Sequence, residues 1–367
     1  MIGNYKKILV INLMHIGDLL LVTPVLRTLR ANYPDAHISL LADAKLQDLV
    51  KYNKNIDELI TIDKKGYHNT FMNYLSFVRQ IRDRHFDLVI NLHSNERASF
   101  IAAFSGAGKI VGYATFGLKW LFDQTIENRK AIKHQVHAHF DVLRETLGIT
   151  KIDDRGIEMW LDDQAEQTAE KIWTESFRQA NTDKLLKVVG LNVGASWPTK
   201  RWRHEYFAQL ADRFLDDGYG IAFFGGPMDI DMVQLTISLM KNKNHPLLKV
   251  FTGSMTLLEL AALLKKCTAL VTNDSGPMHV AVAMHVPLVS MFGPSPVPGF
   301  YPYNDTSVVI RTSLDCHPCG KHKCPTQHEC MWEIDVDTVY QHTIQQITNL
   351  VRQLPGKYVL PEKRSNK

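Results

Sequence analysis

The sequence predicts an α/β protein built from two doubly wound parallel sheets. Short runs rich in Val, Ile and Leu alternate with longer amphipathic segments, the pattern of βαβ units whose strands are covered on both faces. This alternation occurs in each half of the chain, and 367 residues suffice for two domains of ordinary size. Apolar residues make up 45% of the chain, so a folded core is expected and a disordered or fibrous protein is excluded.

The first half is expected to alternate five strands with four helices. Each predicted strand is a short apolar run, and each predicted helix is a longer segment with apolar residues on one face. The expected strands are 7–12, 37–42, 58–63, 87–92 and 109–113, and the expected helices are 19–33, 43–52, 68–84 and 96–105.

The second half repeats this scheme after a polar stretch that contains one predicted helix, 164–179. The expected strands are 187–193, 219–224, 248–252, 269–273 and 287–292, and the expected helices are 204–216, 229–241, 256–266 and 277–284. We therefore divide the chain into a first domain at 1–165, a linker region at 166–186, a second domain at 187–334 and a last helix at 335–354 that ends before Pro355-Gly356.

Charge and hydropathy narrow the class of protein. The net charge of +4 is too small to indicate a nucleic-acid-binding protein, although a pI near 8.6 is compatible with contact to an anionic membrane surface. No apolar run approaches the roughly 18 residues that span a bilayer. Asn12, His15 and Asp18 interrupt the first apolar run, which favours a first strand over a signal peptide. We expect a cytoplasmic protein, in keeping with only five cysteines.

The turn after the first strand, 13–20, is the first candidate site. It lacks the G-x-G-x-x-G pattern of dinucleotide-binding sites and has one glycine, Gly17, followed by Asp18. Asp18 opens a helix at the carboxyl end of a strand, where ligands bind in open α/β sheets. Two roles remain open: capping the helix or complementing its dipole, or acting as a general base that takes a proton from a substrate hydroxyl.

The segment 272–279, T-N-D-S-G-P-M-H, is the second candidate site. Asp or Ser followed by proline is ordinary chemistry for a helix start. The same start can also bind a diphosphate through the amides of Ser275 and Gly276, with Asp274 accepting hydrogen bonds from sugar hydroxyls. His279 lies one turn further along and is either a packed core histidine or a functional residue of this site.

Two further loops carry suitable side chains. Ser196, Thr199 and Lys200 follow the first strand of the second half, and their side chains suit the binding of a phosphate. The alternative is that this Trp-rich loop only packs against the rest of the domain. A Gly225-Gly226 turn ends the next strand, where a base or ribose can approach the backbone and Asp229 can reach ribose hydroxyls; the alternative is an ordinary tight turn.

Together these motifs resemble the ADP-heptose:lipopolysaccharide heptosyltransferases of glycosyltransferase family 9. The resemblance rests on I-G-D at 16–18, T-P-V-L at 23–26, G-G-P at 225–227, N-D-S-G-P-M-H at 273–279 and G-P-S at 293–295, and covers roughly residues 7–350. Within the family, the chain is more similar to the third, branch-adding enzymes than to the first.

The resemblance implies a GT-B architecture: two Rossmann-like domains that face each other across a cleft, with the last helix packing back on the first domain. It implies an acceptor bound mainly by the first domain and a nucleotide sugar bound by the second. Asp18 matches the family's catalytic base, Lys200 its diphosphate-binding lysine, Asp229 its acidic nucleotide-side residue, and Asp274 with Ser275-Gly276 its donor loop. Ser196, Thr199, Gly226 and His279 complete the expected donor site.

The function implied is inverting transfer of L-glycero-D-manno-heptose from ADP-heptose to a heptose hydroxyl of the lipopolysaccharide inner core. No cofactor and no catalytic metal are expected. The lipid-linked acceptor implies a peripheral position at the cytoplasmic face of the inner membrane. The acceptor-binding residues stay open, although Lys64 and Arg97 lie in loops that can meet core phosphates or stay solvated. A sugar-nucleotide epimerase and a non-catalytic nucleotide-sugar binding module are the alternatives.

Four of the five cysteines lie in one segment, Cys316, Cys319, Cys324 and Cys330, spaced C-x2-C-x4-C-x5-C. Such a cluster can hold a structural zinc ion, or consist of reduced or locally disulfide-linked thiols.

Overall fold

The computed structural model describes residues 3–178, 186–253 and 255–348 and the short strand Tyr358–Val359. The chain divides into two compact units, Met1–Trp160 and Leu161–Lys367. The first boundary therefore falls slightly before the predicted 165/166. No helix within the described residues is both long and apolar enough to cross a membrane.

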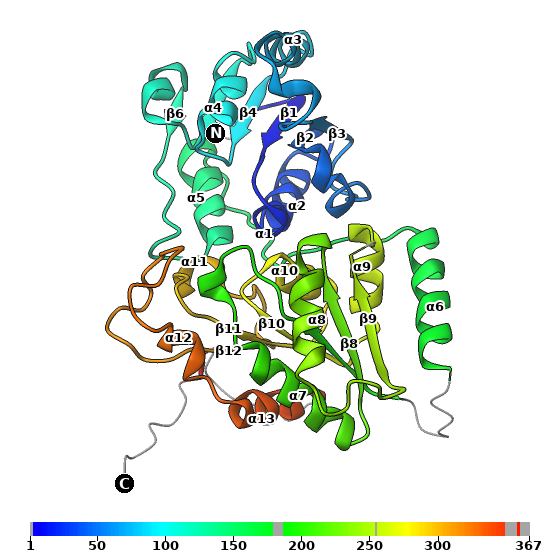
Figure 1. Ribbon diagram of the computed structural model, residues 1–367. Helices are drawn as coiled ribbons and strands as arrows, with labels where there is room; N and C mark the ends of the chain where they lie inside the picture. The colour runs from blue at the N-terminus through cyan, green and yellow to red at the C-terminus, as the bar shows by residue number, and fades with distance from the viewer. Residues whose placement is uncertain (1–2, 179–185, 254, 349–357, 360–367) are drawn as a thin grey trace. The chain divides into compact units, whose positions relative to one another are not determined.

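Unit 1 is a parallel six-stranded sheet in the order β3-β2-β1-β4-β5-β6. Figure 1 shows its strands and the helices that accompany them. Its strands are β1 (Lys7–Ile11), β2 (His37–Asp43), β3 (Glu58–Ile62), β4 (Leu88–Asn91), β5 (Lys109–Gly112) and β6 (Gln124–Thr125). Its helices are α1 (Ile16–Leu20), α2 (Thr23–Asn32), α3 (Phe71–Arg82), α4 (Glu96–Ala103) and α5 (Gln135–Leu147), with 3-10 turns η1 (Ala44–Leu49), η2 (Tyr67–Asn69) and η3 (Phe116–Leu121).

Unit 2 is a parallel seven-stranded sheet in the order β13-β12-β11-β10-β7-β8-β9. Its strands are β7 (Val188–Asn192), β8 (Gly220–Gly225), β9 (Leu248–Thr252), β10 (Ala269–Asn273), β11 (Leu288–Met291), β12 (Val308–Ile310) and β13 (Tyr358–Val359). Its helices are α6 (Asp163–Phe177), α7 (His204–Asp216), α8 (Ile230–Ser238), α9 (Leu257–Leu264), α10 (Gly276–Ala283), α11 (Val297–Phe300), α12 (Glu329–Trp332) and α13 (Val336–Ile347), with 3-10 turns η4 (Pro198–Lys200) and η5 (Pro227–Asp229).

Both sheets confirm the predicted doubly wound parallel class. Counted from its own first strand, each sheet contains the order 3-2-1-4-5-6 of Rossmann-like domains, and β13 is added as a seventh strand in unit 2. The central strands are completely buried, as expected for a sheet covered on both faces: Ile8 to Ile11 of β1 and Ala269 to Val271 of β10 expose none of their surface.

The predicted helix 19–33 is divided into α1 and α2. Pro24 lies in the first turn of α2, where its missing N–H costs nothing, whereas in the middle of a longer helix it would remove a hydrogen bond. The Thr23 hydroxyl donates to the carbonyl of Leu20 at 2.8 Å, which closes the junction. This break ends α1 two residues after Asp18 and gives α2 its own N-terminus.

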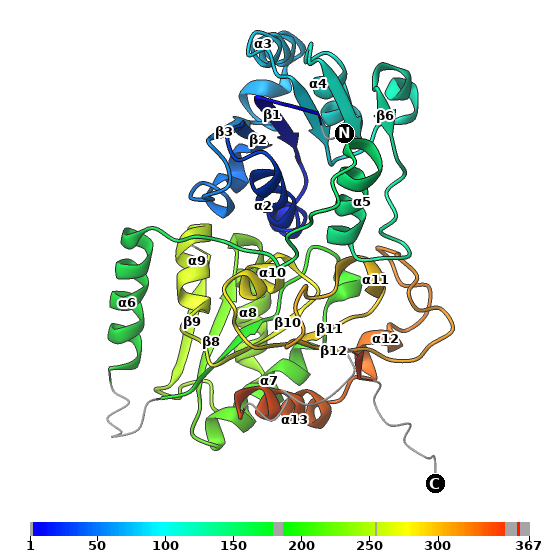
Figure 2. The ribbon, with the colours of Figure 1, turned by 180° about the vertical axis from the view of Figure 1, so that it is seen from behind.

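The last described helix, α13, lies within the predicted last helix 335–354, and apolar residues of α13 pack within unit 2. Packing of this segment back on the first domain stays a prediction. Val339 and Ile347 belong to the core of unit 2, and the Tyr340 ring lies 4.9 Å from that of Phe214 in α7. Both ribbon views show α13 beside α7 (Figures 1 and 2). The predicted end of this helix at 354 lies outside the described residues.

The predicted linker region 166–186 begins inside α6, in agreement with the helix predicted at 164–179. The Asp162 side chain caps α6 by accepting from the amide of Ala165 at 2.9 Å. α6 lies beside α9 in both ribbon views (Figures 1 and 2). Lys265, just after α9, forms a 2.7 Å ion pair with Glu166. The described part of this segment is therefore a helix that belongs to unit 2.

A buried arginine holds the end of unit 1 in place. Arg27 in α2 is 7% exposed and forms ion pairs with Glu158 at 2.7 Å and Asp153 at 3.0 Å. It also donates to the carbonyl oxygen of Gly156 at 2.9 Å. The chain after α5 is thus held to α2 by this guanidinium, together with hydrogen bonds to the side chains of Thr23, Thr28 and Asn32.

We expect Arg27→Met to lower the free energy of unfolding of unit 1 by about 3 kcal/mol, because the partly buried carboxylate of Glu158 and the carbonyl of Gly156 lose their donor, whereas Asp153 keeps Arg155. Urea denaturation followed by circular dichroism measures the change. Arg79→Met is the matched control, since the Arg79 side chain is 84% exposed and lies 4.0 Å from Asp83; it should change stability by less than about 0.5 kcal/mol. Equal effects of the two substitutions would contradict the role of Arg27.

Candidate functional site

The predicted site residues lie at equivalent points of the two sheets. In each sheet the strand order reverses beside the first strand, between β1 and β4 in unit 1 and between β7 and β10 in unit 2. At such a point the loops after the two strands diverge, and ligands of open α/β sheets bind at the carboxyl ends. Asp18 follows β1, Lys200 follows β7 and Asp274 follows β10.

Asp18 lies in the first turn of α1 with its side chain 13% exposed. The N-cap of α1 is His15, so Asp18 is not the capping residue, although its charge still suits the helix dipole. Its Oδ2 lies 3.8 Å from Nδ1 of His15, whose side chain is 93% exposed. Hydrogen bonding to Asp18 is the main cause that raises the pKa of His15.

Two more histidines lie within electrostatic reach of Asp18. His93 follows β4, and its burial lowers its pKa to about 4 while the negative charge of Asp18 opposes that shift. His139 in α5 is completely buried, and its pKa is lowered to about 3 for the same reason, again opposed by Asp18. Both imidazoles are therefore neutral at neutral pH, and the surroundings of Asp18 are largely desolvated. The sequence patterns did not single out either histidine.

The two cations suggested for the acceptor side are both engaged. Lys64 forms a 2.9 Å ion pair with Asp43 and donates to the carbonyl of Leu13 at 2.5 Å. Arg97 donates to the carbonyl of Lys64 at 2.9 Å, and its guanidinium lies 5.5 Å from the centre of the Tyr74 ring. Lys64 places a positive charge next to the Asp18 loop, whereas Arg97 holds the Lys64 loop in shape.

In unit 2, Lys200 and Asp274 form an ion pair with 2.7 Å between Nζ and Oδ2. The side chains are only 16% and 6% exposed, respectively. The hydroxyl of Ser295, after β11, donates to the same Oδ2 at 2.5 Å. Two predicted donor residues thus come together, and Ser295, the last residue of the G-P-S motif at 293–295, joins them.

The start of α10 is held by buried amides. Ser275 is its N-cap and Gly276 its first residue. The Asn192 amide, at the end of β7, donates to the Ser275 hydroxyl at 3.0 Å, and Asn273 donates to the carbonyl of Val193 at 2.8 Å. These bonds join the loops after β7 and β10. His279 is 4% exposed and lies among the buried residues of α10.

The loop 196–200 places its three predicted residues differently. Ser196 is exposed and Lys200 reaches Asp274, but Thr199 is buried and its hydroxyl donates to the carbonyl of Lys321 at 2.8 Å. The Thr199 hydroxyl therefore donates its proton to the backbone of the Cys-rich segment and not to a phosphate. Trp197 lies between Lys200 and His322: Lys200 Nζ is 4.5 Å from its ring centre, and the His322 ring is 3.7 Å away.

Asp229 closes the Gly225-Gly226 turn. Its Oδ2 accepts a hydrogen bond from the Gly226 amide at 2.8 Å. A Cβ on Gly194 would lie 2.1 Å from Asp229 Oδ1, and one on Gly225 would lie 2.7 Å from Asp229 Cβ. These two glycines therefore accommodate the Asp229 side chain. Gly226 is different, because φ is −81° and a Cβ there would meet nothing closer than 3.9 Å.

The four clustered cysteines are free thiols in the structure. Burial is the main cause that raises the pKa of Cys330 to about 12, and the charges of Cys316, Cys319 and Cys324 contribute. The segment packs on the donor-side loops through Lys321 and His328, both of which contact Thr199. Within the ranges that the structure describes, no three His, Cys, Asp or Glu side chains are grouped to hold a metal ion.

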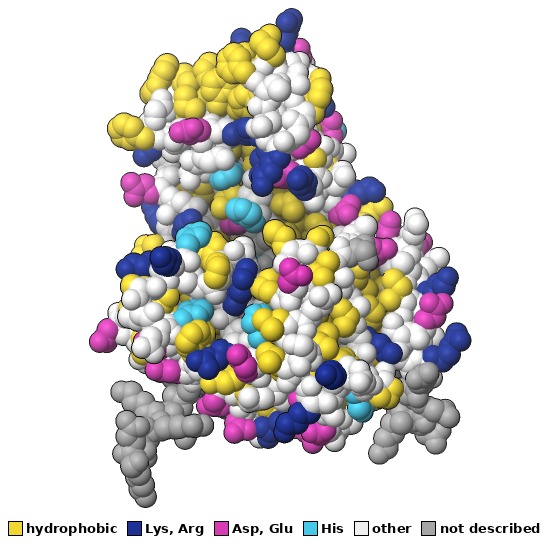
Figure 3. All heavy atoms as spheres, in the orientation of Figure 1, with side chains coloured by type: hydrophobic (Ala, Val, Ile, Leu, Met, Phe, Trp, Pro, Cys, Tyr) yellow, Lys and Arg dark blue, Asp and Glu magenta, His cyan; other side chains and the backbone are white. Residues whose placement is uncertain are grey.

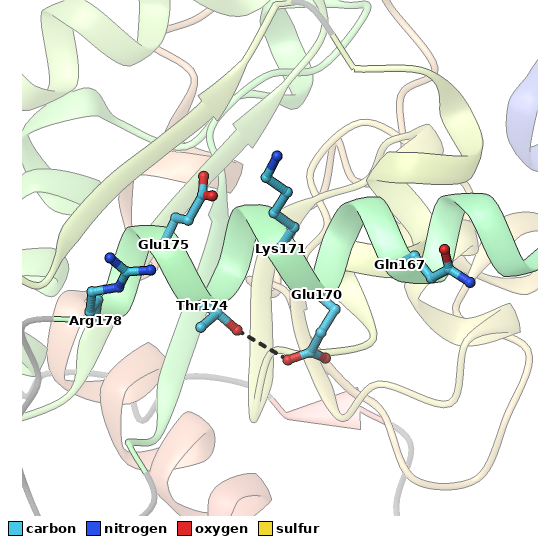
Figure 4. A pocket seen from close by; sticks show the side chains of 6 residues that line it. All are labelled: Gln167, Glu170, Lys171, Thr174, Glu175 and Arg178. Atoms are coloured by element: carbon cyan, nitrogen blue, oxygen red, sulfur yellow. Dashed lines mark hydrogen bonds between the residues drawn. The ribbon is translucent and has the colours of Figure 1, made fainter.

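A separate pocket lies along α6, far from these residues in the sequence. Figure 4 shows that its lining comes from one helix, with Thr174 donating to Glu170 at 3.1 Å. The lining residues are Gln167, Glu170, Lys171, Thr174, Glu175 and Arg178. None of them is a predicted site residue, and the mixed charges favour no ligand class.

The chain is similar to known proteins over most of its length. Residues 74–329 match the family described as glycosyltransferase family 9 (heptosyltransferase). A solved glycosyl transferase family 9 structure from Veillonella parvula is 34% identical, with a TM-score of 0.86 over 95% of this chain and 99% of that one. Lipopolysaccharide heptosyltransferase 2 of Escherichia coli K12 is 26% identical over 86% of this chain and 90% of its own length. Lipopolysaccharide heptosyltransferase 3 of the same strain is 25% identical over 85% and 88%.

Proposed function

Because the chain belongs to glycosyltransferase family 9 (heptosyltransferase), we propose that it moves L-glycero-D-manno-heptose from ADP-heptose to a heptose hydroxyl of the lipopolysaccharide inner core. The similarity to proteins named lipopolysaccharide heptosyltransferase 2 and 3 supports this substrate class. The observation that carries the proposal is the placement of one carboxylate, Asp18, and one cation–carboxylate pair, Lys200 with Asp274, at the switch points of the two sheets.

Asp18 is proposed as the general base on the acceptor side, in unit 1. Its carboxylate is mostly buried but still accessible, and its neighbours His93 and His139 are neutral. A desolvated carboxylate takes a proton from a hydroxyl more readily than a fully hydrated one does. The cation of Lys64 nearby would favour an acceptor that carries negative charge.

The donor side is proposed to consist of the loops after β7, β8 and β10. The Lys200 ammonium has three N–H groups, so it can keep Asp274 and still donate to a diphosphate oxygen. Lys200 and Ser295 both contact Oδ2 of Asp274, which leaves Oδ1 to accept from a sugar hydroxyl. Ser196, the amides of Ser275 and Gly276, and His279 would complete the site, with Gly226 and Asp229 on the nucleotide side.

The proposed reaction is a single displacement with inversion. Asp18 removes the proton of an acceptor heptose hydroxyl, and that oxygen forms a bond to the anomeric carbon of the donor. The bond from that carbon to the diphosphate breaks with its electron pair, and ADP leaves. Lys200 and the amino end of α10 stabilise the charge that develops on the leaving diphosphate. No step in this mechanism uses a metal ion.

The acceptor is anchored in a bilayer, so the proposed location is the cytoplasmic face of the inner membrane, with peripheral attachment.

The test of the function is mass spectrometry of truncated core acceptors incubated with the purified protein and ADP-heptose, beside an acceptor-free control. Gain of one heptose on one acceptor is the expected result. A donor consumed or altered in the control alone would instead favour an epimerase or hydrolase, and ADP-heptose binding with no conversion of either substrate would favour a binding module.

A further inference from the structure

Unit 1 exposes a group of large apolar side chains that take no part in its core. We call Tyr67, Phe71, Met72, Phe104, Phe116 and Trp120 the aromatic patch. Their exposed fractions run from 41% for Phe104 to 90% for Phe116. Isolated exposed apolar residues are common, but a contiguous group of this kind marks an interaction surface.

The patch extends over four neighbouring elements, η2, α3, α4 and η3, and the Asn73 side chain of α3 donates to the carbonyl of Tyr67 in η2 at 2.8 Å. The Tyr74 hydroxyl of α3 donates to the carbonyl of Arg97 in α4 at 2.8 Å, and the Tyr74 ring lies 5.7 Å from that of Phe100. The Phe100 ring in turn lies 4.4 Å from that of Phe104. The amide of Thr115, just before η3, donates to the hydroxyl of Ser99 in α4 at 3.0 Å. Figure 3 shows hydrophobic side chains gathered over α3, α4 and η3 at the top of the view.

The shape and chemistry of the patch fit a lipid surface. The apolar side chains project from two 3-10 turns, the first turn of α3 and the residue after α4, rather than lining a groove. Trp, Tyr, Phe and Met on such projections suit the boundary between headgroups and acyl chains, where an apolar ring and a polar edge are both accommodated.

The charges around the patch favour an anionic surface. Lys119 lies between Phe116 and Trp120 in η3, and Lys65 precedes Tyr67; both are exposed, and the ion pairs among the described residues include neither. The nearby carboxylates are engaged: Asp63 accepts from the amides of Gly66 and Tyr67, and Asp123 accepts from that of Ile110. Glu96, in the first turn of α4, is the exposed acidic residue on these elements and complements the helix dipole.

We propose that the aromatic patch, with Lys65 and Lys119, is the surface by which unit 1 docks on a bilayer that contains anionic phospholipid. This deepens the proposed function and rests on it in one respect, since a membrane-anchored acceptor requires the enzyme to reach the bilayer. The docking itself needs no acceptor: insertion of the rings removes apolar surface from water, and each lysine adds attraction to the headgroups.

The test is sedimentation of the full-length protein with vesicles of phosphatidylcholine containing phosphatidylglycerol and no lipopolysaccharide. The variant F116S/W120S should lower the vesicle-bound fraction by about tenfold, and F71S/M72S should also lower it. The matched control is L235S/L239S, which removes two apolar side chains of unit 2 that are 48% and 45% exposed. It should leave binding unchanged. K65E/K119E should weaken binding to anionic vesicles and make it less sensitive to salt.

A delipidated core acceptor separates this proposal from the proposed function. F116S/W120S should transfer heptose to that acceptor as fast as the unaltered protein does, with an unchanged melting temperature. Vesicle binding that survives both patch variants would overturn the docking proposal. A patch variant that changes from dimer to monomer but still binds vesicles would also overturn the docking proposal, because the patch would then be an interface between two copies of the chain. Absence of transfer by the unaltered protein would overturn the function alone.

Discussion

Replacing Asp18 with asparagine should lower the rate of heptose transfer by about 10²-fold or more, while ADP binding stays close to that of the unaltered protein. The substitution keeps the size and most hydrogen bonds of the side chain but removes its ability to accept a proton. Asp18 lies in unit 1, and the residues proposed to bind the nucleotide lie in unit 2, so binding and chemistry should separate. Initial rates with saturating acceptor, together with calorimetric titration of ADP, measure the two effects.

The control is Asp35→Asn, which removes one carboxylate from an exposed turn of unit 1 and should leave the rate unchanged. A second readout checks the geometry. Since hydrogen bonding to Asp18 raises the pKa of His15, the pKa of His15 should fall in the Asp18→Asn variant, as followed by NMR. Transfer within about threefold of the unaltered rate, with this fall in pKa observed, would show that Asp18 is not the base.

The two-sheet architecture could be predicted because its signal is local. Strands such as β9 and β10 are short apolar runs bounded by polar residues, and the observed bounds Leu248–Thr252 and Ala269–Asn273 equal the predicted ones. The GT-B class implied by the resemblance is confirmed as two Rossmann-like parallel sheets in a family 9 chain. Repetition of one strand order in both units is the physical basis of that class.

Helix α5 shows where local signals fail. Its sequence, Q-V-H-A-H-F-D-V-L-R-E-T-L, places polar residues such as Gln135 and His139 in buried positions, so the expected separation of polar and apolar faces is blurred. Tertiary contacts decide here: Gln135 lies 3.3 Å from the His139 ring, and the Tyr113 hydroxyl lies 3.4 Å from its Nδ1. The same helix supplies one of the neutral imidazoles near Asp18.

The candidate site was predictable as a set of residues but not as a set of contacts. Asp18, Lys200 and Asp274 each follow a strand, and that position marks them in the sequence. That Lys200 pairs with Asp274 depends on β7 and β10 being neighbours in the sheet, which the chain order does not reveal. Ser295 joins the same carboxylate because β11 lies next to β10.

Replacing Lys200 with alanine should weaken ADP binding by about 10²-fold, because the diphosphate loses a charged hydrogen-bond donor that lies in a largely buried position. The measured quantities are the Kd for ADP and the melting temperature. Lys200→Arg keeps the positive charge and should retain part of the affinity, although its planar group does not reproduce an ammonium.

The double variant K200A/D274N decides what Lys200 does. If the lysine served only to neutralise Asp274, removing that negative charge as well would restore ADP binding. If it donates directly to the diphosphate, as proposed, the double variant should bind ADP as weakly as Lys200→Ala, even though its melting temperature recovers. Asp274→Asn alone should keep ADP binding, because the cation remains, but should weaken binding of the intact nucleotide sugar, since the charged acceptor for the sugar hydroxyls is lost. Recovered ADP affinity in the double variant would reduce the Lys200–Asp274 pair to a structural ion pair.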